Sequence, residues 1–360
     1  MHAAGHFSAS YAQARQRFLA AAASSDLQIE SHALPMPGRD GEVLAMDVAR
    51  DGPAQAAALL IISSGCHGVE GFCGSGLQLA LLADDAWRES ARAAGVAVLY
   101  IHGLNPHGFS WWRRTTHENI DLNRNFCDFD AERPASPEYD ALADLLVPDT
   151  WPPDAAVMSG VARFVAARGE RALQQAISGG QYRHPDGLFY GGTAPSWSHR
   201  ALRGVLHEHG RHARRLAWID VHTGLGPSGH GERIHAGPDD PATLARARAW
   251  WGPITSIHDG SSTSARLTGM MWQAAPQECP EAEYTGIALE VGTLSQPEVI
   301  DALRADQWLQ NHPEAGAEQR AAIKRQIRDA FYTDTDAWKA RVIEQGIDAA
   351  EGAMRGLAAG

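Results

Sequence analysis

Short runs of apolar residues recur along the chain, separated by stretches that have the periodicity of amphipathic helices. The runs at 58–62, 96–101, 216–221 and 286–291 are almost entirely apolar, which is typical of strands covered on both faces of a sheet. Helical spacing occupies 77–94, 161–177, 199–215 and 241–251. This alternation predicts an α/β fold with helices on both faces of the sheet.

The two ends of the chain differ from this alternating centre. Residues 10–23 have helical spacing, and 27–34 and 42–48 alternate like the arms of a β-hairpin. After Gly292 the pattern is helical through 297–309, 313–332 and 335–357, while the Pro-, Asp- and Gly-rich stretches 134–154 and 179–198 indicate ordered insertions. Since the chain contains no internal repeat or linker, we expect one domain over 1–360, with a core at about 56–295 and a helical extension at about 296–360.

Charge and composition exclude several classes of partner. The 360 residues carry 31 Lys and Arg against 43 Asp and Glu, a net charge of −12 without a basic stripe, which argues against nucleic acid. No run approaches the ~18 apolar residues of a membrane helix, and the N-terminus does not resemble a signal peptide, so we expect a cytoplasmic protein without a membrane partner. Cys66, Cys73, Cys127 and Cys279 form no CxxC pair and are interpreted as reduced thiols.

A histidine and a glutamate directly follow the first apolar run. His67 and Glu70 lie three residues apart in Ser64-Gly-Cys-His-Gly-Val-Glu-Gly71, at the carboxyl end of the predicted strand, where open α/β sheets keep their sites. An H-x-x-E pair can hold one metal ion if the loop coils into the next helix. The alternative is a hydrogen-bonded cap without a metal.

A second histidine ends the third apolar run. His222 stands in Asp220-Val-His-Thr-Gly224, and two histidines with one carboxylate are the ligands of a catalytic zinc that keeps an open position. Asp220, two residues earlier on the same strand face, is suited to orient His222. The alternative is that both residues simply cap the strand.

Arginines and a lone glutamate supply further candidate chemistry. The stretch between the strands contains Asn105-Pro-His-Gly, then Arg113 and Arg114, then Asp121-Leu-Asn-Arg-Asn-Phe126. An arginine beside asparagines can clamp a carboxylate, although Arg124 could equally pair with Asp121 or Asp128. Glu290 interrupts the last apolar strand, and beside a metal-bound water it could act as a general base with a raised pKa.

Taken in order, these motifs resemble the zinc carboxypeptidase superfamily. The set H-x-x-E, N-P-x-G, R-x(6)-D-L-N-R-N-F, D-x-H-T-G and a late strand glutamate runs from about 65 to 292. The superfamily also holds the aspartoacylase and succinylglutamate desuccinylase deacylases. The chain is most similar to its bacterial carboxypeptidase-like branch with the motif G-x-H-G-V-E-G-F.

The resemblance implies a three-layer αβα sandwich with a mixed, mainly parallel sheet, and a role for each matching residue. It implies zinc on His67, Glu70 and His222, and Glu290 as general base and acid. Arg114 would polarise the scissile carbonyl, with Arg113 as the alternative if the register shifts by one. Asn123 and Arg124 would hold the terminal carboxylate of the substrate, while Tyr190 and Tyr284 are candidates for an assisting tyrosine without a supporting motif.

The sequence therefore predicts a zinc-dependent hydrolase that cleaves an amide bond next to a free carboxylate in a peptide or small molecule. An N-acyl amino acid deacylase would share every motif, and a non-catalytic zinc- or ligand-binding relative is disfavoured because the motifs are intact. No H-E-x-x-H or G-x-S-x-G motif competes. Cys66 and His67 are a weak nucleophile pair, because neighbours on a turn rarely reach the necessary geometry. The oligomeric state is left open.

Overall fold

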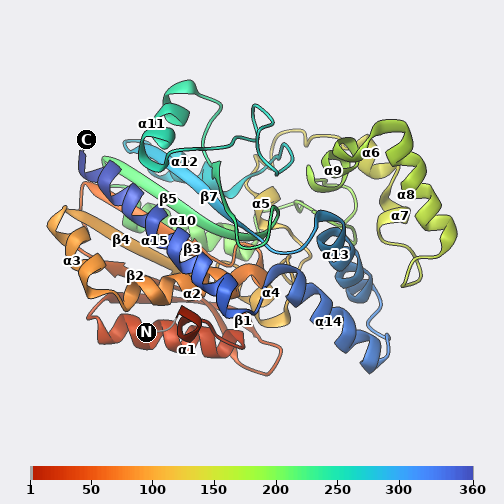
Figure 1. Ribbon diagram of the computed structural model, residues 1–360, viewed down its shortest axis with the longest axis horizontal. Helices are drawn as coiled ribbons and strands as arrows, with labels where there is room; N and C mark the ends of the chain where they lie inside the picture. Colours follow the sequence, from red (N-terminus) through yellow and green to blue (C-terminus); the bar gives the residue numbers. More distant parts are fainter. Residues whose placement is uncertain (1–2, 360) are drawn as a thin grey trace.

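A seven-stranded mixed sheet lies between two layers of helices in the computed structural model, which describes residues 3–359 (Figure 1). The strand order is β1-β2-β4-β3-β5-β7-β6. Strands β4, β3, β5 and β7 are parallel, whereas β1, β2 and β6 pair antiparallel with their neighbours. The predicted α/β sandwich is confirmed. The strands are β1 (Gln28–Pro37), β2 (Val43–Asp51), β3 (Ala58–Ser64), β4 (Val96–His102), β5 (Arg215–Gly224), β6 (Gly231–His235) and β7 (Glu283–Gly292).

Helices cover both faces of this sheet. Helices α1, α2, α11 and α15 pack on one face, where their apolar side chains join one cluster, and α10 and α12 pack on the other face (Figure 1). The helices are α1 (Tyr11–Ser24), α2 (Gly71–Leu82), α3 (Asp85–Ala93), α4 (Pro106–Trp111), α5 (Leu122–Asn125), α6 (Pro137–Asp140), α7 (Ala143–Leu146), α8 (Ala155–Arg168), α9 (Glu170–Ser178), α10 (Trp197–Gly210), α11 (Pro241–Trp251), α12 (Ala274–Glu278), α13 (Gln296–Asn311), α14 (Ala317–Phe331) and α15 (Asp336–Ala359), with 3₁₀ turns η1 (Ala3–His6), η2 (Gly68–Glu70) and η3 (Met271–Gln273).

Two predicted helices are each divided in two. The helical stretch 77–94 is interrupted at Asp84, whose side chain accepts from the Trp87 backbone N–H and starts α3. The stretch 161–177 is interrupted at Gly169, which has a φ of 85°. Both divisions depend on local capping and backbone conformation, which the spacing of apolar residues does not report.

A group of helices stands over the carboxyl ends of the parallel strands. Helices α6 to α9 come from the stretch that includes the predicted insertion 134–154, and α13 and α14 from the C-terminal part (right side of Figure 1). Their apolar side chains share a cluster that includes Ile177, Leu303 and Phe331. These helices therefore wall the end of the sheet at which the sequence predicts a site.

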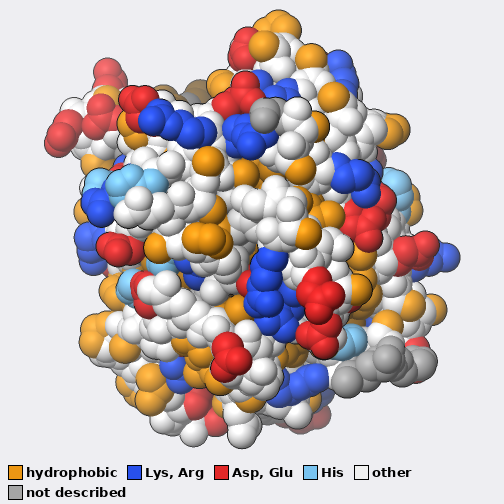
Figure 2. Space-filling view, turned by 90° about the vertical axis from the view of Figure 1, so that its left-hand side faces the viewer, with side chains coloured by type: hydrophobic (Ala, Val, Ile, Leu, Met, Phe, Trp, Pro, Cys, Tyr) orange, Lys and Arg blue, Asp and Glu red, His pale blue; other side chains and the backbone are white. Residues whose placement is uncertain are grey.

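The surface on the side of the molecule opposite helices α6 to α9, the left-hand side of Figure 1, carries a mixture of charges. Figure 2 shows acidic and basic side chains lying among one another across this face, a pattern typical of a solvated surface. Within residues 3–359, the helices lack the combination of length and apolar character that a membrane span requires.

Candidate metal centre

Three buried side chains converge at the carboxyl ends of β3 and β5. His67 lies just after β3, Glu70 in η2 and His222 in β5. The Nδ1 atoms of His67 and His222 are 3.3 Å apart, and Glu70 places its carboxylate oxygens 2.8 Å from the first and 3.0 Å from the second. The structure thus brings together the three ligands expected from the sequence.

Glycines allow the loop after β3 to coil into this position. Gly65 has a φ of 72°, a conformation that favours glycine. A Cβ atom at Gly68 would lie 2.0 Å from the Gly108 carbonyl carbon, so only glycine fits where these two segments touch. The backbone N–H groups of Gly68 and Val69 donate to the carbonyl oxygens of Arg114 and Arg113, respectively. These hydrogen bonds hold the loop after β3 against the segment that carries the two arginines.

Charges around the centre keep its carboxylate ionised. Burial opposes ionisation of Glu70, but His67 and His222 together hold its pKa below the ordinary value. Burial also opposes protonation of His222, but Asp220 and Glu70 raise its pKa well above the usual range. A metal ion bound here would therefore displace a proton from the imidazole.

Asp220 orients His222 from behind. Its Oδ2 lies 2.5 Å from His222 Nε2, and its Oδ1 accepts from the Ser63 hydroxyl at 2.6 Å. Trp218 in turn donates its indole N–H to Ser63 at 2.7 Å. With the proton of His222 held on Nε2 toward Asp220, Nδ1 is left to face Glu70 and His67, as a metal ligand requires.

The donor set fits a divalent transition metal. Two imidazole nitrogens and a carboxylate converge in a buried place, with their candidate ligand atoms within 4.8 Å of one another. Two histidines and one glutamate leave room in a tetrahedral shell for a water or a substrate. Among the described residues, Cys66, Asp220 and His222 form a second candidate set that shares His222. Burial raises the pKa of Cys66 well above its ordinary value, so a metal ion bound by this second set would also have to displace the proton of the thiol.

Arg114 lies against this cluster, and Asp121 holds it there. Arg114 donates from Nε to Asp121 Oδ2 at 2.8 Å, and its Nη2 lies 2.7 Å from His67 Nε2. The side chain is 14% exposed and lines the same cavity as the candidate metal ligands. Arg113 instead points away from this cavity, toward Asp306 at 3.0 Å.

Arg124 and Asn123 lie on a second wall of the same cavity. Arg124 donates to the backbone carbonyls of Asn123 at 2.8 Å and Ser178 at 2.5 Å, and it approaches Asp121 only to 4.0 Å. Its buried Nε has no hydrogen-bond partner in the described chain. Asn123 accepts from the Met271 backbone N–H at 2.9 Å, which attaches the wall to η3.

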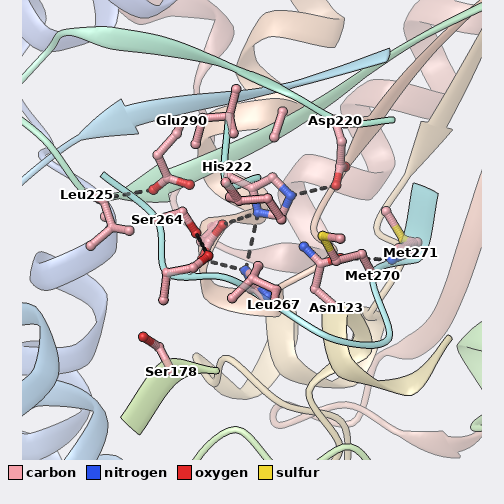
Figure 3. A pocket seen from close by; sticks show the side chains of 18 of the residues that line it. Asn123, Ser178, Asp220, His222, Leu225, Ser264, Leu267, Met270, Met271 and Glu290 are labelled. Carbon is pink, nitrogen blue, oxygen red and sulfur yellow. Dashed lines mark hydrogen bonds and ion pairs between the residues drawn. The ribbon is translucent and has the colours of Figure 1, made fainter. Parts of the chain in front are cut away.

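Glu290 on β7 lines the same cavity as the candidate metal ligands His67, Glu70 and His222. It stands opposite His222 in the β5–β7 register, and its carboxylate accepts from the Leu225 backbone N–H at 3.0 Å (Figure 3). Burial, reinforced by the negative charge of Glu70, raises the pKa of Glu290 to about 7. The cavity that these groups line has a volume of about 120 Å³. One cavity therefore combines a metal-type donor set, two arginines and a carboxyl group suited to proton transfer.

Comparison with known proteins identifies the family. A model described as "Protein of unknown function (DUF2817)" matches residues 7–345. The chain belongs to this family. No curated protein matches the sequence of this DUF2817 protein.

Several solved structures are similar in fold to the DUF2817 chain. Carboxypeptidase A from Helicoverpa armigera is 11% identical, with 89% of this chain and 73% of that chain covered and a TM-score of 0.42. A metallo-carboxypeptidase from Pseudomonas aeruginosa is 14% identical, with 91% and 68% covered and a TM-score of 0.41. A succinylglutamate desuccinylase from a Silicibacter species is 14% identical, with 84% and 65% covered and a TM-score of 0.40. Carboxypeptidases and a desuccinylase, names that also occur in the superfamily that the motifs resemble, are therefore among the structures of similar fold.

Sequence reasoning missed the central position of Asp121. This carboxylate accepts from Arg114, lies 3.3 Å from His67 Nε2, and starts α5 by accepting from the Asn123 backbone N–H at 2.9 Å. The sequence signal that could have indicated this role was the position of Asp121 at the start of the D-L-N-R motif, two residues before Asn123. Of the two candidate tyrosines, Tyr284 lines the cavity, whereas Tyr190 offers its backbone carbonyl to the N–H of Asp121.

Arg113 belongs to a buried ion network in this DUF2817 protein. Asp306 on α13 accepts from Arg113 and from Lys324 on α14 at 2.6 Å, and the Arg113 and Asp306 side chains are only 3% and 6% exposed. Burial would raise the pKa of Asp306, but Lys324 and Arg113 lower it below the ordinary value. The network therefore fixes the backbone at Arg113 and Arg114, whose carbonyl oxygens accept from the loop that carries His67 and Glu70.

Asp306→Asn is expected to lower the free energy of unfolding at pH 7 by roughly 3–5 kcal/mol, because it leaves the buried Arg113 and the partly exposed Lys324 without a carboxylate. Since the folded-state pKa is depressed, this stabilisation is present above the unfolded pKa of about 3.9 and is lost as pH falls below it. Urea unfolding at several pH values measures the difference. Asp301→Asn on the same helix, whose carboxylate is 47% exposed, is the control and should cost less than about 1 kcal/mol. Equal losses in the two variants would contradict the prediction.

Proposed function

We propose that this chain is a zinc-dependent hydrolase that cleaves an amide bond next to a free carboxylate, in the manner of a carboxypeptidase. One observation carries the proposal: Glu290 faces the His67, Glu70 and His222 cluster inside a cavity that Arg114 and Arg124 also line. A metal-type donor set, a carboxyl group of raised pKa and a cationic wall are what hydrolysis of an amide with a neighbouring carboxylate requires.

Zinc held by His67, Glu70 and His222 would supply a water of lowered pKa and polarise a carbonyl oxygen. The residues of the chain provide the remaining steps. Glu290 accepts a proton from the attacking water and returns it to the leaving amine. Arg114 donates to the carbonyl oxygen as negative charge develops there, and Asp121 keeps its guanidinium in position through the 2.8 Å hydrogen bond.

Arg124 and Asn123 are proposed to bind the carboxylate of the substrate. The unpartnered Nε of Arg124 and its place on the cavity wall support this role, because a buried guanidinium donor without an acceptor favours an anion. The long 4.0 Å approach to Asp121 leaves Arg124 less neutralised than a close ion pair would.

Two alternatives use the same centre. An N-acyl amino acid deacylase would place the same carboxylate on Arg124 and differ only in which side of the amide fills the rest of the cavity. A non-catalytic binding protein would have no use for a glutamate facing the metal ligands, and the position of Glu290 argues against it.

A substrate panel with and without chelator tests the proposal. Zinc-loaded protein is incubated with N-acyl dipeptides, longer peptides and N-acyl amino acids, and the released amine is quantified. We expect hydrolysis of the peptides, loss of activity with chelator and its recovery with zinc. Cleavage of N-acyl amino acids alone would support the deacylase, and bound zinc without any hydrolysis would support the binding protein.

Arg124→Ala is expected to abolish discrimination between a substrate and its C-terminal amide. In the wild type, kcat/KM should be about 10- to 100-fold lower for the amide, because the charge-assisted hydrogen bonds to the carboxylate are lost. In the variant the acid should fall to the level of the amide. Arg168→Ala, at a side chain 60% exposed, is the control and should preserve the discrimination. Equal wild-type rates for acid and amide would refute carboxylate recognition.

A further inference from the structure

A narrow slot leads away from Glu290 along the face of the sheet. Glu290, Ala288, Gly286 and Tyr284 alternate on this face of β7, and Ala288 is flanked by Asp220 on β5 and Ile234 on β6. Two residues of strand span about 6.6 Å, so the slot extends for roughly 13 Å between positions 290 and 286. It is open over Ala288, whose side chain is one methyl group, and it ends over Gly286, where the Tyr284 hydroxyl fills the space that a Cβ atom would take.

The hydroxyl of Tyr284 closes the far end of this slot. A Cβ atom at Gly286 would lie 2.2 Å from this hydroxyl, which therefore sits directly over the glycine. The ring stacks on Trp272 with centroids 6.3 Å apart, and the residue is 6% exposed. Yet its hydroxyl has no hydrogen-bond partner in residues 3–359. Since Tyr284 lines the cavity, its unpartnered hydroxyl is suited to pair with a ligand at this end of the slot.

The walls between these two ends are mainly apolar, and the cavity lining also includes the polar side chains of His235 and Ser264. Ile234, Ile257, Leu267 and Met270 line the cavity, and Leu267 and Met270 lie near His222 in Figure 3. Asp220 borders the slot with a carboxylate, whereas the cavity-lining arginines belong to the segment at 114–124. An anionic side chain would meet Asp220 in the slot and find no arginine there.

We propose that this slot selects the side chain of the substrate residue whose carboxylate is held by Arg124. The side chain it takes is neutral, apolar along its length, and ends in a hydrogen-bonding group that pairs with the Tyr284 hydroxyl, as a phenol does. The assignment rests on the proposed function, since it places the substrate in the same centre. It makes Tyr284 a specificity residue, and it disfavours acidic amino acids as the carboxylate-bearing part of the substrate.

Matched substrates test the assignment on zinc-loaded protein. N-acetylglycyl-L-tyrosine, -phenylalanine and -glutamate differ only in the side chain that would enter the slot. We expect kcat/KM to be about tenfold higher for tyrosine than for phenylalanine, the effect of one net hydrogen bond. Glutamate should be at least about 100-fold slower than phenylalanine, because its charge loses hydration without a cation. In Tyr284→Phe the ratio of tyrosine to phenylalanine should fall to about one.

Tyr100→Phe is the matched control. Tyr100 is fully buried on the other face of the sheet, where its hydroxyl accepts from Trp87 at 3.2 Å, and its replacement should leave the tyrosine-to-phenylalanine ratio intact. In Ala288→Leu the added side chain should occupy the slot and shift preference from tyrosine to alanine at the substrate C-terminus. Equal wild-type rates for tyrosine and phenylalanine, a preference for glutamate, or a tyrosine preference that survives in Tyr284→Phe would each overturn the assignment.

Binding separates failure of the slot from failure of the proposed function. Free L-tyrosine and L-phenylalanine are titrated into wild-type and Tyr284→Phe protein by calorimetry. Tighter binding of tyrosine that is lost in the variant, without hydrolysis of any substrate, would uphold the slot and overturn the hydrolase. Absence of both hydrolysis and selective binding would overturn both.

Discussion

Glu290→Gln is expected to lower kcat by about 10²- to 10⁴-fold while the protein still binds one zinc ion per chain. The amide of glutamine keeps the shape of the side chain and can still accept from the Leu225 N–H, which the carboxylate does at 3.0 Å. It cannot take a proton from water or deliver one to the leaving amine. Since Glu290 is not among the candidate ligands, metal content should not change.

Steady-state kinetics on a verified substrate, together with elemental analysis, measures both halves of this expectation. Glu283→Gln provides the control, because Glu283 starts the same strand with a side chain 53% exposed and pairs with Arg246 at 3.3 Å. That variant should retain wild-type kcat. A Glu290→Gln protein with wild-type kcat would place the base elsewhere, and loss of zinc would make Glu290 part of the metal site.

The sequence was most informative where burial on both faces leaves a continuous apolar run. All seven residues of β3 and of β4 are buried, and both strands were predicted. Strand β6 was missed because Gly231–His235 is a short edge strand in which Glu232 and Arg233 interrupt the apolar pattern. An edge strand of this kind is specified by its pairing with β7 rather than by its own residues.

The same contrast applies to the candidate site. His67, Glu70, His222 and Glu290 became candidates because the carboxyl ends of parallel strands meet at one edge, and the resemblance to the zinc carboxypeptidase superfamily supplied their roles. The partner of Arg113 could not be predicted, since Asp306 lies 193 residues away on a helix whose pattern shows only that one face is buried. Contacts of that length depend on how the C-terminal helices dock onto the domain.

His67→Ala is expected to reduce bound zinc from one per chain to near zero, because a tetrahedral centre with three protein ligands cannot hold the metal tightly with two. Glu70→Ala and His222→Ala should do the same. Asp220→Asn should have a smaller effect, a 10- to 100-fold loss of affinity, because Asp220 orients His222 rather than binding the metal. Elemental analysis after dialysis against zinc buffers measures the occupancy of each variant.

Controls and one further variant identify which residues form the centre. His207→Ala and His212→Ala remove exposed histidines and should leave zinc at one per chain. Cys66→Ala distinguishes the two candidate ligand sets, since Cys66 occurs only with Asp220 and His222, and His67 only with Glu70 and His222. If zinc is retained in Cys66→Ala and lost in His67→Ala, the metal lies on His67, Glu70 and His222, which line the same cavity as Glu290. The reverse result would place the metal on Cys66, Asp220 and His222 instead, and would remove the basis for the proposed hydrolysis with Glu290 as the base.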